Sequence, residues 1–168
     1  WHGHFERLER SIKFLNIFLP IGRRALLNLH RQLIKRNNLS DGMIYMQVSR
    51  GSAERSFLIG DSYKPSLVMF CQEIDLCSSS RFERGLKIVT VPETRWKHRD
   101  IKTSQLLSAS LAKTQAHNRG FDDAWFVEDG YVTEGTSSNA FIIVEKKIVT
   151  RKAGKEILPG ITRSSILK

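Results

Sequence analysis

The segment TEGTSSNAF occupies residues 133–141 and is the most informative stretch of the sequence. It places Glu134 at the end of a predicted strand, directly before a run of small hydroxyl-bearing residues. A glutamate in this position is ordinarily part of a hairpin rim or of a helix cap. By itself the segment therefore indicates a turn beside a strand, and it leaves the chemistry of Glu134 open.

Two further segments contain residues that could carry chemistry. The charged loop RWKHRDIKT, residues 95–103, contains Lys102, although a lysine in such a loop is ordinarily just solvated. The turn LPGITR, residues 158–163, places small residues at a predicted helix start, where free backbone N–H groups can bind a phosphate. Ordinary helix capping explains that turn equally well. Each segment alone is weak support for a site.

Hydrophobic periodicity around these segments predicts the secondary structure. Apolar residues at three- and four-residue steps predict helices over residues 5–15 and 23–36. Alternation predicts a strand that begins at Met43, and the segment 66–72, apolar on both faces, predicts a second strand that is buried. Further strands are expected over residues 86–91, 124–127, 131–133, 139–144 and 148–150, and further helices from Ser104 to Gly120 and from Thr162.

Two local signals refine this organisation. The pair Asp129-Gly130 between two predicted strands is typical of a tight hairpin turn. Between Leu76 and Arg84 the composition changes from apolar to small and polar, which makes this stretch the best candidate for a domain boundary. Helices mixed with strands come first and a strand-rich half follows, so the sequence indicates an α+β chain.

The composition is that of a globular protein. The 168 residues are 40% apolar and 26% charged, enough for a core in one domain or in two small ones. No apolar run approaches the ~20 residues of a membrane span, and no signal segment supports secretion. Cys71 and Cys77 fit neither a disulfide scaffold nor a zinc motif, and we expect reduced thiols in a cytoplasmic protein.

The net charge of +10 comes from 27 Lys and Arg residues against 17 Asp and Glu residues. Such a surplus favours anionic partners, namely nucleic acid, a phosphate-bearing cofactor or acidic lipid, and it also aids solubility. No Walker loop, dinucleotide fingerprint or nucleophile elbow is present, and His2 and His4 lack the further ligands that a metal site requires. A basic nucleic-acid-binding module is an alternative, but its basic residues are spread over many elements and no recognition signature accompanies them.

Taken together, in this order and spacing, the three segments resemble the class IV aminotransferases, which are pyridoxal-phosphate enzymes of fold type IV. The match is best to the D-amino acid aminotransferase branch. HFERL at 4–8 and YMQVSRG at 45–51 match the small domain of that branch, so the resemblance covers essentially the whole chain.

The resemblance implies a two-domain α+β fold. A small α/β domain is expected over residues 1–77, and a larger, strand-rich pseudo-barrel domain that binds the cofactor is expected over residues 78–168. The family has an N-terminal sheet segment and a C-terminal portion that this sequence lacks. We therefore expect both domains to be partial and the chain to be truncated at both ends.

The resemblance also implies a pyridoxal 5'-phosphate site. Lys102 matches the catalytic lysine that forms the Schiff base and moves a proton, and Glu134 matches the carboxylate that faces the pyridine nitrogen. The small residues after Glu134 would let the cofactor ring approach. Arg7, Ile161 and Thr162 match residues that bind the cofactor phosphate.

Further contacts follow from the same resemblance. Ser137 and Ser138 lie where the family places cofactor-side contacts, and Leu158 matches a residue that packs against the ring. Arg55 resembles the arginine that binds the α-carboxylate of a D-amino acid, a role that suits the guanidinium fork. The branch has a histidine two residues beyond this arginine, whereas Phe57 stands here, so D-amino acid specificity is open.

The implied activity is transamination between an amino acid and a 2-oxo acid by a ping-pong mechanism. The expected donor is a D-amino acid such as D-alanine, and the expected acceptor is 2-oxoglutarate or pyruvate. Branched-chain aminotransferases and aminodeoxychorismate lyases share the lysine, the glutamate and the Gly-Ile-Thr turn, so both are alternatives within the class. Family members are typically homodimers, which we expect here as well.

Overall fold

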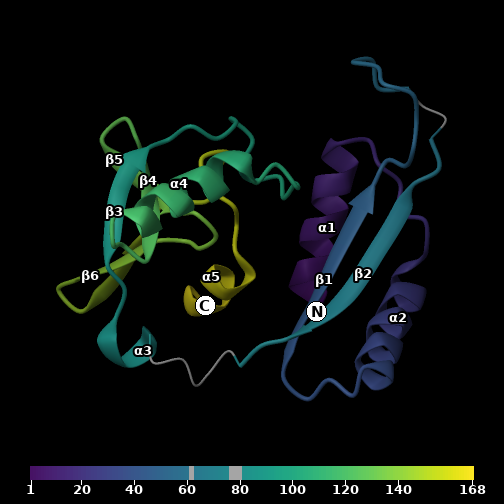
Figure 1. Ribbon diagram of the computed structural model, residues 1–168, viewed down its shortest axis with the longest axis horizontal. Helices are drawn as coiled ribbons and strands as arrows, with labels where there is room; N and C mark the ends of the chain where they lie inside the picture. Colours follow the sequence, from purple (N-terminus) through teal and green to yellow (C-terminus); the bar gives the residue numbers. More distant parts are fainter. Residues whose placement is uncertain (61–62, 76–80) are drawn as a thin grey trace. The chain divides into compact units, whose positions relative to one another are not determined.

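The computed structural model describes residues 1–60, 63–75 and 81–168, with the backbone only for residues 81 and 82. The chain divides into two compact units, Trp1–Phe82 and Glu83–Lys168, which are drawn in Figure 1 and are each described by themselves. The domain boundary predicted between residues 77 and 78 lies outside the described residues.

The first unit contains two helices and a hairpin of strands. The helices are α1 (His2–Phe14) and α2 (Arg23–Arg36), and the antiparallel strands are β1 (Gly42–Ser49) and β2 (Ser66–Glu73). The predicted helices and the strand that begins near Met43 are thus confirmed. A long loop joins β1 to β2, as the polar composition of residues 50–64 suggests.

The prediction that the strand over 66–72 is buried on both faces is wrong. Side chains of β2 alternate between half-buried and exposed, and Val68 and Phe70 are 56% and 48% exposed. Within the described residues β2 pairs with β1 alone, and the half-buried side chains of both strands lie on the same face. Apolar residues on both faces of this strand therefore did not mean that other elements cover both faces of its sheet.

The second unit contains a mixed sheet and a smaller hairpin. Helix α3 (Arg81–Arg84) spans the division between the units. The elements of the second unit are β3 (Ile88–Pro92), α4 (Leu107–Asn118), β4 (Asp123–Glu128), β5 (Tyr131–Gly135), β6 (Phe141–Val144), β7 (Lys147–Thr150) and α5 (Ile161–Ile166). Strands β3, β4 and β5 form one sheet in that order, with β3 parallel to β4 and β4 antiparallel to β5. Strands β6 and β7 form an antiparallel hairpin.

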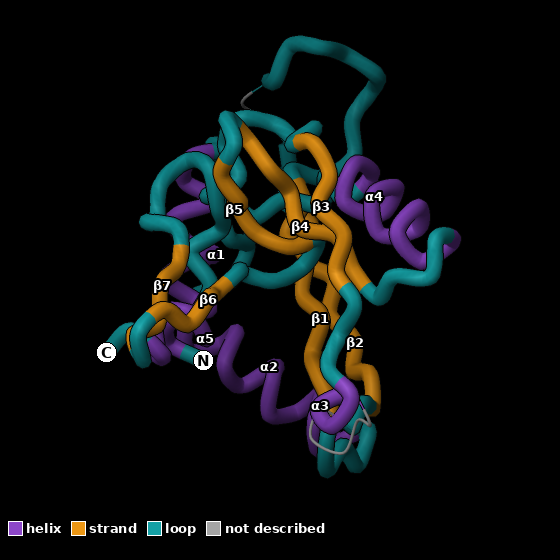
Figure 2. Tube along the Cα trace, turned by 90° about the vertical axis from the view of Figure 1, so that its left-hand side faces the viewer, coloured by secondary structure: helices purple, strands orange, loops and turns teal. Residues whose placement is uncertain are grey.

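Helix α4 lies beside the sheet of the second unit (Figure 2), and the core of this unit lies between them. Small side chains on α4 pack against β4, which lets the helix backbone approach the strands closely. The buried residues of this contact are Ala109, Ala112, Ala116, Ala124 and Phe126. Helix α4 also connects β3 to the parallel strand β4, so it is the crossover that a parallel pair requires.

Turn and cap residues decide the local boundaries of this unit. Asp129 and Gly130 have φ values of 52° and 79°, which confirms the hairpin that this pair predicts. Gly120 follows helix α4 with φ at 79° and ends it as expected. The predicted start of that helix at Ser104 is wrong, because the helix begins at Leu107 and the backbone N–H of Leu106 donates to Ser104 O instead.

None of the helices within the described ranges combines the length and the apolar character that a bilayer span requires. In the same ranges, no group of three or more His, Cys, Asp and Glu side chains is placed to hold a metal ion.

Candidate active site

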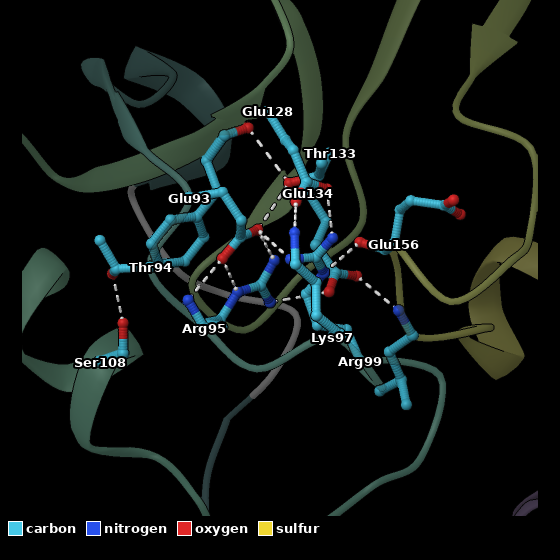
Figure 3. A network of polar contacts seen from close by, with 12 residues as sticks. Glu93, Thr94, Arg95, Lys97, Arg99, Ser108, Glu128, Thr133, Glu134 and Glu156 are labelled. Carbon is cyan, nitrogen blue, oxygen red and sulfur yellow. Dashed lines mark hydrogen bonds and ion pairs between the residues drawn. The ribbon is translucent and has the colours of Figure 1, made fainter.

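Glu134 lies near the end of β5 and joins the three sequence segments. Its side chain is buried, with the residue 4% exposed. Oε1 accepts a hydrogen bond from Arg95 Nη1 at 2.8 Å, as Figure 3 shows. Oε2 accepts from Asn139 Nδ2 at 3.0 Å and from the backbone N–H of Leu158 at 3.0 Å. One carboxylate therefore contacts all three segments.

Asn139 holds the turn at 158–160 against the end of β5. Its side-chain amide donates to Leu158 O at 2.8 Å in addition to Glu134. A Cβ atom added at Gly160 would overlap Asn139 Oδ1, so the backbone of the turn lies directly on this side chain. The absence of a side chain at Gly160 is therefore what allows the turn to lie so close to Asn139.

Arg95 bridges two carboxylates at the ends of β3 and β5. Its Nε and Nη2 donate to Glu93 Oε1 at 2.9 Å and Oε2 at 2.6 Å, while Nη1 binds Glu134. The guanidinium plane also lies 4.3 Å from the ring centroid of Phe126, which is a cation–π contact. Arg95 is therefore held by two carboxylates and one aromatic ring.

The two carboxylates bound to Arg95 have pKa values that move in opposite directions. Burial raises the pKa of Glu134, and the hydrogen bonds from Arg95 and from the Leu158 amide only partly oppose it. Burial also raises the pKa of Glu93, but the hydrogen bonds and charge of Arg95 and the charge of Arg99 outweigh it, so the net shift is downward. Of the two, Glu93 is thus held more firmly as the anion.

The loop that carries Lys102 begins at Arg95 and is anchored along its length. Ile101 is buried, and its backbone N–H donates to His98 O at 3.0 Å. Arg99 is also buried, and its side chain reaches Glu156 O, Glu128 and Glu93. Lys102 itself is exposed. The structure therefore places Lys102 on a loop whose first residue binds Glu134.

The other predicted residues of the second unit lie around these contacts. Ser137 and Ser138 follow β5 and are exposed, and Ser138 O accepts a hydrogen bond from the Gly135 backbone N–H at 2.7 Å. Ile161 and Thr162 are the first residues of α5. Their backbone N–H groups lie in the first turn, where an α-helix has no internal acceptors for them.

Arg7 and Arg55 belong to the first unit. Arg7 lies on α1, where burial and then the charge of Arg10 lower its pKa, and its Nη2 is 3.4 Å from His4 Nδ1. Arg55 lies in the exposed loop between β1 and β2, with its guanidinium 5.1 Å from the ring centroid of Phe57. Phe57 therefore contacts the arginine from the position where a histidine was expected.

Sequence reasoning missed the residues that surround Glu134. Arg95 and Asn139 are in the informative segments but had no predicted role, and Glu93 and Arg99 were not singled out. Directly after a strand, every second residue from 93 to 99 is charged. That two-residue spacing was the available signal, because it can place several charges on one side of an extended segment.

Comparison with known proteins identifies the family. The family model described as amino-transferase class IV matches residues 1–168. The chain belongs to the class IV aminotransferases. The predicted family is confirmed, and with it the α+β fold of this class.

Individual relatives agree with this family. The chain is 36% identical over 166 residues to the D-alanine aminotransferase of Staphylococcus aureus strain MSSA476, covering 98% of this chain and 58% of the relative. The chain thus spans somewhat more than half the length of the curated relatives it matches.

Solved structures show the same fold. A protein provisionally assigned as a 4-amino-4-deoxychorismate lyase, from Legionella pneumophila, has a TM-score of 0.85 at 27% identity, covering 99% of this chain and 61% of its own. The branched-chain amino acid aminotransferase of Thermobaculum terrenum in its PLP form has a TM-score of 0.76 at 22% identity, covering 98% and 55%.

Proposed function

We propose that this protein is a pyridoxal-phosphate-dependent aminotransferase that transfers the amino group of an amino acid to a 2-oxo acid. The observation that carries the proposal is the buried Glu134 carboxylate, which binds Arg95, Asn139 and the Leu158 amide from three separate segments. Membership of the class IV aminotransferases supports the same activity.

The bonding of Glu134 fits a protonated pyridine nitrogen. A carboxylate offers about four acceptor positions, two on each oxygen. Oε2 accepts two hydrogen bonds and Oε1 accepts one, so Oε1 retains a position for one further N–H donor. Arg95 favours the ionised form of Glu134, which is the form that accepts such a donor.

The remaining contacts to the cofactor are assigned as the resemblance implies. Leu158 would pack against the ring, and Ser137 and Ser138 would contact the same side of the cofactor. The first backbone N–H groups of α5 and the Thr162 hydroxyl suit a phosphate. The phosphate ligands proposed for this chain are Ile161, Thr162 and Arg7.

Lys102 is proposed as the catalytic residue. Its amine would carry the cofactor as a Schiff base and then move a proton from the α-carbon of the substrate. The cofactor, when bound, supplies an electron sink for that step, and Glu134 holds the ring nitrogen in its protonated form. The two half-reactions would follow one another in ping-pong order, and Lys102 would move the proton in each.

We infer that the amino donor is a D-amino acid such as D-alanine, with Arg55 as the carboxylate ligand. The D-alanine aminotransferase relative at 36% identity favours this donor. The solved structures named above include a branched-chain aminotransferase and a protein provisionally assigned as a lyase, so both activities stay alternatives. The family match favours an enzyme over a nucleic-acid-binding module, and the expected homodimer stays a prediction.

Absorption spectroscopy of the full-length protein with pyridoxal phosphate tests the proposal. We expect a visible band that is lost in Lys102→Ala and kept in Lys152→Ala, which changes an exposed lysine of the same unit. The band should be bleached by D-alanine and less by L-leucine. Release of pyruvate from aminodeoxychorismate would indicate the lyase instead. A folded protein with no band, or with the same band in Lys102→Ala, would contradict the proposal.

A further inference from the structure

Arg99 is a buried cation in a loop that was expected to be solvated. The residue is 5% exposed, three positions before Lys102. Its neighbour Lys97 in the same loop has an 83% exposed side chain and also binds Glu128, at 3.0 Å. Burying a guanidinium is costly unless several partners compensate. The contacts of Arg99 therefore indicate what its burial achieves.

Arg99 binds the segment that precedes Leu158 twice. Its backbone N–H donates to Lys155 O at 3.0 Å, and its Nε donates to Glu156 O at 2.8 Å. The next residue, Ile157, is buried, with 1% of its surface exposed. The loop of Lys102 and the segment 155–158 are thus held together through one residue.

The other end of the guanidinium hydrogen-bonds the end of one strand through Nη2, while the buried Nη1 makes no hydrogen bond to any described residue and is close enough to a second strand end only for an ion pair. Nη2 pairs with Glu128 at the end of β4, and Nη1 lies 3.6 Å from Glu93 Oε2 just after β3, as Figure 3 shows. Both carboxylates have a second cation, Arg95 for Glu93 and Lys97 for Glu128. Neither carboxylate therefore needs Arg99 in order to have a partner.

These contacts close a ring of interactions. Arg95 binds Glu134, Glu134 binds the Leu158 amide, and the chain runs back from Leu158 to Glu156, which binds Arg99. The loop then returns from Arg99 to Arg95 through three intervening residues. Glu134 and the lysine loop are consequently connected by two routes, one directly through Arg95 and one through segment 156–158 and Arg99.

We infer that Arg99 is a positioning residue for Lys102, because its guanidinium ties the lysine loop to the segment 155–158 and thereby to Glu134. The inference rests on the proposed function, in which Lys102 and Glu134 are the cofactor ligands. A fork of several donors is required for this role. A lysine carries its three N–H donors on one nitrogen, so it cannot reproduce contacts that Arg99 makes from two separate nitrogens, Nε to Glu156 O and Nη2 to Glu128.

Hydrogen exchange of the full-length protein tests the coupling without the cofactor. In Arg99→Met we expect the amides of residues 100–103 and 156–158 to exchange about tenfold faster or more, with β3, β4 and β5 unchanged. Arg84→Met is the matched control, since Arg84 also binds a carboxylate through two nitrogens, that of Asp122, but on the surface. It should leave both segments unchanged.

A second measurement links the coupling to the cofactor. Titration with pyridoxal phosphate should show about tenfold weaker binding for Arg99→Met than for the wild type, with the Arg84→Met control unchanged. Arg99→Lys keeps the charge but not the several separate nitrogens of the guanidinium. Compared with Arg99→Met, it should restore most of the resistance to urea. It should restore less of the cofactor affinity and less of the slow amide exchange at residues 156–158. Recovery of all three by Arg99→Lys would overturn the inference, because charge alone would then suffice.

Other results also decide the matter. Equal acceleration of exchange over the whole second unit would make Arg99 a general stabiliser and would overturn the inference. Faster exchange confined to the two segments, but with cofactor affinity unchanged, would overturn the role toward Lys102. If the wild-type protein shows no cofactor binding that depends on Lys102, the proposed function fails. In that case the exchange of Arg99→Met still shows whether Arg99 couples the two segments.

Discussion

The second unit contains two buried regions that are held together by different forces. Where α4 meets the sheet, alanine side chains pack against one another and against Phe126 through apolar contacts alone. Around Glu134, a cluster of five charged residues is held by hydrogen bonds and ion pairs of fixed geometry. This ion cluster consists of Glu93, Arg95, Arg99, Glu128 and Glu134.

The difference shows what each region is suited to. Apolar packing is non-directional and roughly proportional to the buried area, so it stabilises the unit as a whole. Ion pairs in a buried site contribute less net stability, because desolvation offsets their attraction, but they fix where each charged atom lies. We therefore expect the apolar contact between α4 and the sheet to contribute most of the stability of the unit. We expect the ion cluster to determine where Glu134 lies.

The largest effect on stability should come from Phe126→Ala. Phe126 is fully buried, and removing its ring leaves a cavity between α4 and the sheet, so the free energy of unfolding should fall by about 4 kcal/mol. Urea unfolding followed by circular dichroism measures this loss. Phe126→Leu distinguishes the contributions of the two regions. It keeps most of the apolar volume in the core but removes the aromatic ring that contacts Arg95. A smaller loss for Phe126→Ala than for Arg95→Met would contradict the division of roles between the two regions.

Arg95→Met should have the next largest effect, about 3 kcal/mol, because it leaves Glu134 and Glu93 buried with fewer partners. The loss should be smaller at pH 5 than at pH 8, since Glu134 can then take up a proton and avoid the buried charge. Unfolding in urea at both pH values gives the two losses. If they are equal, Arg95 does not control the charge of Glu134.

Gly160→Ala should cost about 1 to 2 kcal/mol, because the new Cβ atom overlaps Asn139 Oδ1 and the turn must move away. The same substitution made in an Asn139→Ala background should cost less, since the overlapping atom is gone. Unfolding free energies of the two single variants and the double variant complete this cycle. Additive losses would show that the turn does not depend on Asn139.

The smallest effect concerns pH, and it distinguishes Glu134 from Glu93. The pKa of Glu134 lies above its ordinary value of 4.5, so this group destabilises the folded state progressively as pH rises from about 4.5 through the raised pKa. The pKa of Glu93 lies below 4.5, so its contribution is present above about 4.5 and is lost as pH falls through the lowered pKa.

Glutamine variants reveal the two directions. Relative to wild type, Glu134→Gln should become more stable as pH rises from 4 to 8, whereas Glu93→Gln should become less stable. Unfolding at a series of pH values measures both trends. Parallel trends in the two variants would show that burial and pairing do not shift the pKa values of these two carboxylates in opposite directions.

Much of the secondary structure could be predicted from local patterns. The helix over 23–36 has the predicted bounds, and Asp129-Gly130 marks the hairpin because only a few residue types tolerate its positive φ values. The error at residues 66–72 has a physical cause. Periodicity describes a strand, whereas burial depends on what other elements cover it, and that is a property of the tertiary structure.

The site was less accessible to sequence reasoning. Lys102 and Glu134 were assigned through the family resemblance, since a lysine in a charged loop and a glutamate at a strand end are ordinarily unremarkable. Arg95 and Arg99 were missed because charged residues are rarely buried, and burial of a charge depends on partners that lie far away in the sequence. Their partners Glu134 and Glu128 lie 39 and 29 positions along the chain.

The hydrogen bond from the Leu158 amide to Glu134 does not depend on the side chain at position 158. The donor is a main-chain atom, so it is retained by every residue at this position except proline, which lacks the N–H group. The side chain at 158 can therefore change in size and shape without loss of the carboxylate anchor. Position 158 is consequently a place where the side chain can vary while the glutamate stays where it is.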